Sequence, residues 1–195
     1  MKAAAPSTLA EVELRGEFKF TAYWNPSVLT DEEGNASLSF TLPDNLTTFR
    51  IMAVAQTTDS RFGRAESNFR TSKPLQLIPA LPRFARIGDQ FKGGVTIHNY
   101  TLKKGKVTLS CEAIGINLLD KNNIRSFSLA SGESREILYS FEVKKPGKAF
   151  LAFRAQMGEE TDGLEISFPL KMPRPSETVA FFEKTTKSKE EIIRI

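Results

Sequence analysis

Short runs in which apolar and polar residues alternate recur along this chain, separated by residues that favour turns. In residues 17–24, for example, an apolar side chain occupies every second position. Period two places successive side chains on opposite faces of a β-strand, so each run predicts a strand with one buried face. No stretch has a convincing helical period. We therefore expect an all-β fold.

The first unit of the chain, residues 16–72, holds few strands. We expect strands at residues 17–24, 36–42, 47–56 and 64–71, with a turn at 31–35. The run at 47–56 is apolar at nearly every position, which is typical of a central strand buried on both faces. Four strands bury too little apolar surface to stand alone. This unit must therefore take strands from elsewhere in a longer protein or pack hard against the next unit.

The second unit, residues 73–172, predicts one complete sandwich. Strands are expected at 91–99, 106–113, 124–129, 136–143, 149–155 and 164–170, and Leu81 is expected in an edge strand flanked by Pro79 and Pro82. Turn signals separate them at 103–105, 131–132, 145–147 and 161–163. Short strands separated at roughly 8–12-residue intervals indicate a sandwich, and about seven of them match one immunoglobulin-like unit.

We expect four segments in all. Residues 1–15 are a flexible lead-in, 16–72 part of a sandwich, 73–172 a complete one, and 173–195 a linker that opens a further unit. The expected architecture is immunoglobulin- or fibronectin-III-like β-sandwich domains in tandem. The N-terminal residues lack the apolar core of a signal peptide, so we expect a segment excised from a longer protein.

Charge and composition disfavour several classes of function. The chain has 27 basic and 23 acidic residues, with a net charge of +4, so its charge is mixed. Lysines cluster at 103–106 and 144–148, each around a glycine, which predicts solvated hairpin tips more than a phosphate-binding surface. We expect no nucleic-acid partner and no direct membrane contact by this segment. A single cysteine excludes an internal disulfide.

The residue types needed for catalysis are scarce. His98 is the only histidine and Cys111 the only cysteine. One of each is too few for a zinc site, and any Ser-His-Asp or Cys-His site would have to be built around His98. Alternation places His98 on the face opposite Val95 and Ile97, which predicts an exposed strand residue. The acidic segments 31–35 and 159–163 lack EF-hand spacing. We expect no catalytic residue, no metal site and no cofactor.

One motif in the first unit is specific enough to indicate kinship. An aromatic pair with Asn-Pro is followed by a Pro-Asp-Asn turn and then by a Thr-Thr-Phe segment that leads into an apolar strand. The residues are Tyr23, Trp24, Asn25, Pro26, Pro43, Asp44, Asn45, Thr47, Thr48 and Phe49. The pattern resembles the signature region of the alpha-2-macroglobulin family, especially its bacterial members. By their residue types, Asp44 and Asn45 form a turn, which is a structural role.

The resemblance extends over almost the whole chain. It implies that residues 16–72 are the C-terminal part of a macroglobulin domain, 73–172 a complete macroglobulin domain and 173–195 the start of a CUB-like domain. Residues 1–15 would be the end of the protease-sensitive bait region, with Lys2 and Arg15 as candidate cleavage sites. An ordinary linker explains the same residues equally well.

Members of this family are described as traps that collapse around a protease once it cuts the bait region, and a C-G-E-Q thioester can tether it. Cys111 is followed by Glu112 and Ala113, which departs from that motif, so we expect Cys111 to be a buried strand residue and no thioester here.

The resemblance thus implies a non-catalytic structural segment of an endopeptidase inhibitor. The parent would lie outside the cytoplasm, in the bacterial periplasm, where a lipid could anchor it to a membrane, or secreted. Its partners would be target endopeptidases, through the full-length parent, and the neighbouring domains of the same chain. An immunoglobulin-like surface adhesion or ligand-binding module is the alternative, because sandwich folds host many functions.

Overall fold

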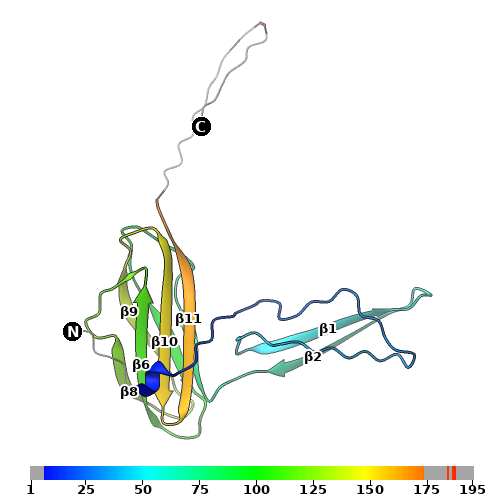
Figure 1. Ribbon diagram of the computed structural model, residues 1–195, viewed down its shortest axis with the longest axis horizontal. Coiled ribbons are helices and arrows are strands. Elements are labelled where there is room, and N and C mark those ends of the chain that lie inside the picture. The colour runs from blue at the N-terminus through cyan, green and yellow to red at the C-terminus, as the bar shows by residue number, and fades with distance from the viewer. Residues whose placement is uncertain (1–6, 174–183, 185, 188–195) are drawn as a thin grey trace.

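A β-sandwich and a long arm that projects from its side make up the described part of this chain (Figure 1). The computed structural model describes residues 7–173, 184 and 186–187. The described chain is all-β apart from the four-residue helix α1 (Ser7–Ala10), which the sequence did not predict. The segment expected at 173–195 to open a CUB-like domain lies, apart from residues 173, 184 and 186–187, outside the described residues.

The sandwich consists of two sheets. One has the strand order β4-β11-β10-β6-β8 and the other β3-β5-β9-β7, and every pair is antiparallel except β11 with β4. The strands are β3 (Leu75–Ala80), β4 (Ala85–Arg86), β5 (Gln90–Asn99), β6 (Gly105–Ile114), β7 (Asn117–Leu118), β8 (Ile124–Leu129), β9 (Ser134–Glu142), β10 (Gly147–Met157) and β11 (Glu160–Lys171). Among the described residues of this unit, nine strands are present where about seven were predicted, and the two shortest, β4 and β7, have two residues each.

The core lies between the two sheets and follows the alternation of the sequence. On β10, every second residue from Ala149 to Met157 is buried. On β5, Val95 and Ile97 are fully buried while His98 is only partly covered and stacks on Tyr100. Pro79 lies in β3, at the edge of its sheet, as expected for a residue that cannot donate to a ladder.

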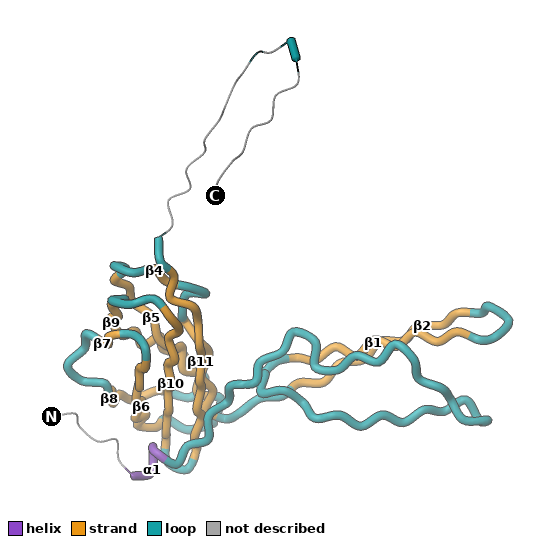
Figure 2. Tube along the Cα trace, turned by 45° about the horizontal axis from the view of Figure 1, so that its top comes forward, coloured by secondary structure: helices purple, strands orange, loops and turns teal. Residues whose placement is uncertain are grey.

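The arm is built around a hairpin of β1 (Thr48–Gln56) and β2 (Phe62–Arg70), paired in register from Thr48 with Arg70 to Gln56 with Phe62. Residues 17–46 run beside the hairpin without joining its ladder (Figure 2). Among the described residues, no strand pairing joins β1 or β2 to the sandwich. The arm therefore has one two-stranded sheet and no second layer.

Three expectations about the arm were wrong. Residues 17–24 and 36–42 are not strands, and β1 is not a central strand, because it has a single neighbour. The alternation is present, but a ladder also needs a neighbouring backbone to accept and donate its hydrogen bonds. Within the described residues these segments run beside the hairpin but form no ladder with it, and most of their large apolar side chains stay exposed.

Two local expectations in the sandwich also need correction. Residues 161–163 were predicted as a turn but lie inside β11, and the turn between β10 and β11 is at Gly158 and Glu159. Residues 1–15 were predicted as a flexible lead-in. In its described part, residues 7–15, Leu9 and Val12 are instead buried, and this part lies along β10 and β11 (Figure 2).

Candidate functional site

Three parts of the chain meet at a buried ion pair between Arg15 and Asp162. The Arg15 guanidinium donates from Nε to Asp162 Oδ1 over 2.8 Å and from Nη2 to Oδ2 over 2.6 Å. Arg15 is 9% exposed and Asp162 is fully buried. A two-point contact of this kind fixes the orientation of both planar groups. We call the region around this pair, where the lead-in, the arm and the sandwich meet, the joint.

The ion pair fills the gap between the edges of the two sheets. Asp162 lies on β11, whose outer neighbour β4 pairs only with Leu170 and Lys171, and Leu77 lies on β3, the edge strand of the other sheet. The amide of Leu77 donates to Asp162 Oδ2 over 2.8 Å, and its carbonyl accepts from Arg15 Nη2 over 3.0 Å. Two charged side chains thus satisfy the backbone groups that a neighbouring strand would otherwise pair.

A buried carboxylate needs compensation, and Asp162 has two cations. Besides Arg15, the ammonium of Lys73 lies 3.3 Å from Oδ1 and reaches in from the partly exposed side of the joint. Breaking a buried ion pair by removing one partner typically costs roughly 3–5 kcal/mol, because the remaining charge stays desolvated. Arg15 therefore has a structural role that its position in the lead-in did not suggest.

The lead-in reaches the joint by pairing with β11. The Arg15 amide donates to the Gly163 carbonyl over 3.0 Å and the Glu165 amide donates to the Arg15 carbonyl over 2.9 Å, which forms a short parallel bridge. A Cβ on Gly163 would come within 2.3 Å of the Glu13 carbonyl oxygen. Only glycine allows the two backbones to approach this closely.

The signature residues Asp44 and Asn45 hold the base of the arm. Asp44 Oδ2 accepts hydrogen bonds from the amides of Gly16 and Glu17 over 2.8 and 2.9 Å, and Asn45 Oδ1 accepts one from the amide of Lys19 over 2.9 Å. The bonds from the Glu17 and Gly16 amides lower the pKa of Asp44 because they favour its charged form. These side chains bind the backbone of residues 16–19, in addition to the turn role that the sequence suggested.

Arg15 also touches this base, so the joint connects arm and sandwich directly. Its Nη1 donates to the Asp44 carbonyl over 3.2 Å. Where the chain leaves the arm after β2, the Thr71 hydroxyl donates to the Asn45 carbonyl over 2.8 Å. One arginine thus contacts the arm at Asp44 and both sheets of the sandwich at Asp162 and Leu77.

Several of the remaining signature residues make contacts within the arm. Tyr23 stacks on Phe40 with ring centroids 4.8 Å apart, and Phe49 stacks on Phe69 at 5.3 Å. Asn25 accepts from the Ser27 amide over 3.0 Å, Trp24 and Pro26 are exposed, and Pro43 is buried. Thr47 bonds with Thr71, and Thr48 is the first residue of β1. Only the part of the motif from Pro43 to Asn45 lies at the joint.

Cys111 is a buried strand residue, as the sequence predicted. It is fully buried on β6, and desolvation raises the pKa of its thiol to about 12. A thiol in this state is a poor nucleophile, because the thiolate is the reactive form. Within the part of the chain that the structure describes, no group of three or more His, Cys, Asp or Glu side chains could hold a metal ion.

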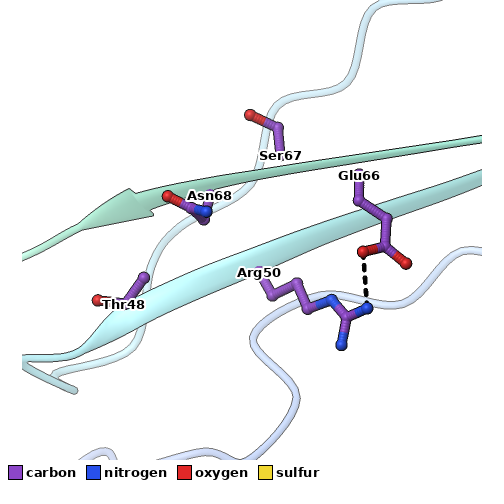
Figure 3. Close-up of a pocket in the computed structure, with 5 residues that line it drawn as sticks. All are labelled: Thr48, Arg50, Glu66, Ser67 and Asn68. Atoms are coloured by element: carbon purple, nitrogen blue, oxygen red, sulfur yellow. Dashed lines mark hydrogen bonds and ion pairs between the residues drawn. The ribbon is translucent and has the colours of Figure 1, made fainter.

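A shallow hollow lies on the arm hairpin, at the ends of β1 and β2 nearest the sandwich. It is lined by Thr48, Arg50, Glu66, Ser67 and Asn68 (Figure 3). All five residues are exposed, and the two charged ones pair with each other over 2.6 Å between Arg50 Nη2 and Glu66 Oε2. The hollow therefore has no unpaired charge and no enclosed wall with which to select a ligand.

Known proteins match most of this chain in sequence. A model described as the Alpha-2-macroglobulin family matches residues 21–111. An alpha-2-macroglobulin homolog from Nostoc sp. is 34% identical over 165 residues, which is 83% of this chain and 9% of that protein. An alpha-2-macroglobulin from Thermotoga maritima is 32% identical over 170 residues, 86% of this chain and 11% of that protein. This chain belongs to the alpha-2-macroglobulin family.

Solved alpha-2-macroglobulin structures share the fold. The trypsin-activated protein from Escherichia coli has a TM-score of 0.65 at 21% identity, over 82% of this chain and 12% of that one. The same protein activated by porcine elastase has a TM-score of 0.64 at 20% identity, over 88% of this chain and 16% of that one. They confirm the all-β macroglobulin sandwich. The chain spans about a tenth of the length of the curated alpha-2-macroglobulins it matches, 9% and 11%.

The sequence reasoning missed Arg15 with Asp162 as a structural pair. It treated Arg15 as a candidate cleavage site in an exposed lead-in, and Asp162 as part of a turn. The two are 147 residues apart in sequence, and no local period links them.

No helix among the described residues is long and apolar enough to cross a membrane.

Proposed function

We propose that this chain is a non-catalytic structural segment of an alpha-2-macroglobulin-type endopeptidase inhibitor, which traps proteases after its bait region is cut. The observation that carries the proposal is the match to the Alpha-2-macroglobulin family model over residues 21–111. Trapping needs parts that move as units when a distant peptide bond is cut. A rigid sandwich and an arm, connected at one joint, suit that task.

The test uses the full-length parent and a target endopeptidase such as trypsin. We expect limited proteolysis to reduce the hydrodynamic radius of the parent and to leave the protease bound. Catalytically inactive trypsin, which binds without cutting, is the control and should change nothing. A parent whose radius stays constant after complete bait cleavage would rule the proposal out.

We also infer that residues 16–72 are the C-terminal part of a macroglobulin domain and that another part of the longer parent completes it. The arm exposes many large apolar side chains. They are Phe18, Phe20, Tyr23, Trp24, Val28, Leu29, Leu38, Phe40, Leu42, Ile51, Met52, Val54 and Phe62. A sheet with two strands and such a surface is marginal in water unless a second layer covers it.

The completion of the arm can be measured by supplying the parent sequence that precedes residue 1. We expect that segment, added in trans or fused, to bind the chain and to lower the binding of a dye that detects exposed apolar surface. A segment of equal length from the end of the parent is the control. Failure of the preceding segment to bind would argue against a shared domain.

The remaining assignments follow from this proposal. Residues 1–15 would end the bait region, and 173–195 would open a CUB-like domain. The parent would act outside the cytoplasm, in the periplasm or secreted, on target endopeptidases. Arg15 stays a candidate cleavage site only for a state in which the lead-in has left the joint, since its side chain is buried and bound to Asp162 here.

A further inference from the structure

We propose that the docked segment from Leu9 to Arg15 is a latch that fixes the direction of the arm relative to the sandwich. When the segment leaves β11, the arm becomes free to pivot. The inference concerns only this chain and can be tested on it. Its connection to bait cleavage, as the event that would release the latch, rests on the proposed function.

Two polypeptide connections join the arm to the sandwich, and they differ in how they are held. The outgoing one runs through Lys73 and Pro74 into β3, where the Tyr100 amide donates to the Pro74 carbonyl over 2.8 Å. This connection belongs to the sandwich ladder and cannot be released without unfolding β3. The incoming one, at Arg15 and Gly16, is held by the docked lead-in. While both connections are held, the arm keeps its direction relative to the sandwich. When only the connection through Lys73 and Pro74 is held, the arm can pivot.

Arg15 is the residue through which the latch acts. Its guanidinium contacts the arm at the Asp44 carbonyl and the sandwich at Asp162 and Leu77, over 2.6 to 3.2 Å. No other described contact of the Asp44 carbonyl reaches the sandwich. Removing Arg15 from the joint therefore ends the direct link between arm and sandwich on this side, while the amides of Gly16 and Glu17 still donate to Asp44 within the arm.

The latch can open without destroying the sandwich, because its contacts are few and peripheral. Beyond Arg15, the docked segment contributes two buried apolar side chains, Leu9 and Val12, and a short parallel bridge to β11. The main core cluster of the sandwich does not include either of these residues. Asp162 keeps the Leu77 amide and Lys73 as partners after Arg15 departs. A small interface of this kind opens at a lower free energy than the whole fold.

The test compares the arm direction in chains with the latch docked and released. Spin labels at Thr58→Cys, in the turn between β1 and β2, and Lys121→Cys, on the sandwich, report the distance between the two parts. Cys111 stays unlabelled because it is fully buried. Its protection from thiol reagents also shows that the sandwich of each variant is folded. Both label sites are exposed.

Gly163→Ala should release the latch while Arg15 itself is unchanged, because the new Cβ would collide with the Glu13 carbonyl oxygen. We expect the distance distribution to broaden and exchange of the Glu165 amide to rise about tenfold or more. Gly63→Ala is the matched control, since a Cβ on Gly63 meets nothing within 4 Å. It should leave both measurements unchanged.

Arg15→Met tests the ion pair itself, with Glu13→Gln as the control on an exposed residue of the same segment. We expect the same broadening, together with faster exchange of the Glu165 amide. A narrow, unchanged distance distribution in variants whose Glu165 amide exchanges faster would overturn the proposal. So would unchanged Glu165 exchange in both variants, or loss of the folded sandwich in both, because a latch must be separable from the fold that it holds.

Discussion

Phe153 in the sandwich and Phe62 in the arm both lie in strands of nine or more residues, yet Phe153 is fully buried and Phe62 is 70% exposed. The difference comes from what lies above each strand. β10 faces a second sheet across the core, whereas β2 has one neighbour in its own sheet and no described layer above it. Among the described residues the sandwich has two facing sheets, whereas the arm has one sheet of two strands.

This contrast separates two kinds of information in an alternating sequence. Alternation says which side chains share a face, and that information is local. Whether the face is covered depends on chain that can be far away in sequence, or in another part of a longer protein. The arm therefore has the composition of a core without having a core, which is why it serves best as the region in which to test for missing partners.

The largest expected effect compares truncation of the two phenylalanines. Phe153→Ala should lower the free energy of unfolding by roughly 3–5 kcal/mol, because it leaves a cavity among fully buried neighbours. Phe62→Ala should change it by less than about 0.5 kcal/mol. Chemical denaturation followed by tyrosine fluorescence measures both. An effect of Phe62→Ala close to that of Phe153→Ala would show that the arm of the isolated chain is already covered.

A second comparison uses two asparagines, each followed by a hydroxyl residue two positions later. Asn99 is fully buried, and its side-chain amide donates to the carbonyls of Lys103, Leu129 and Ala130 over 2.9 to 3.3 Å. Asn99→Ala leaves three carbonyls without this donor, so we expect a loss of roughly 1–3 kcal/mol.

The exposed Asn35, in the turn at residues 31–35, is the control for Asn99. Asn35→Ala should have little effect on thermal unfolding, since the turn is closed by backbone bonds and by Asp31 Oδ1, which accepts from the Asn35 amide. Equal shifts in Tm for the two variants would contradict the distinction between a buried and a solvated turn.

A smaller effect is expected at the base of the arm. Asp44→Ala removes the acceptor for two amides and should cost about 1 kcal/mol, mostly by loosening the arm. Glu33→Ala, an exposed acidic residue without such bonds, should have no measurable effect. Local hydrogen exchange at Gly16 and Glu17 detects the change even where global unfolding does not.

The same site gives a pH dependence. The folded-state pKa of Asp44 is lowered, so the stabilisation is fully present above the ordinary aspartate pKa and is lost as the pH falls through the lower folded value. The amide resonances of Gly16 and Glu17 should therefore shift only below about pH 4. A midpoint above that pH would mean that these bonds do not favour the carboxylate.

The smallest expected effect is chemical. Cys111 is buried, and the pKa of its thiol is raised to about 12, so a thiol reagent at neutral pH should label it only in denaturant. A cysteine introduced at Thr58 in the arm should react at once in the folded chain, since that residue is exposed. Rapid labelling of Cys111 without denaturant would show that the sandwich opens far more readily than its core implies.

The sequence predicted the sandwich better than the arm, for a physical reason. Strands such as β5 and β10 pair with strands that the same chain supplies, so alternation and turn residues sufficed to find them. Residues 17–24 have the same period, but no described strand pairs with them. In both cases the sequence showed which side chains share a face of the strand. It did not show whether another strand pairs with that strand.

The joint could be predicted only in part. Asp44 and Asn45 stood out because their residue types favour turns, although their bonds to Gly16, Glu17 and Lys19 required the structure. Arg15 and Asp162 were missed because an ion pair between remote segments leaves no periodic trace. Gly163 was the available clue, since a glycine inside a strand often marks a close backbone approach, but it was interpreted as part of a turn.

The way in which Arg15 and Asp162 occupy the backbone groups of Leu77 has a consequence for solubility. An open sheet edge recruits further strands and starts aggregation, and charged side chains placed on it block that growth. The β3 edge is protected in this way at its centre, whereas β1 and β2 each offer an unprotected edge beside apolar side chains. Self-association of this chain at high concentration should therefore begin by strand pairing at the arm, and the β3 edge of the sandwich should gain no new strand.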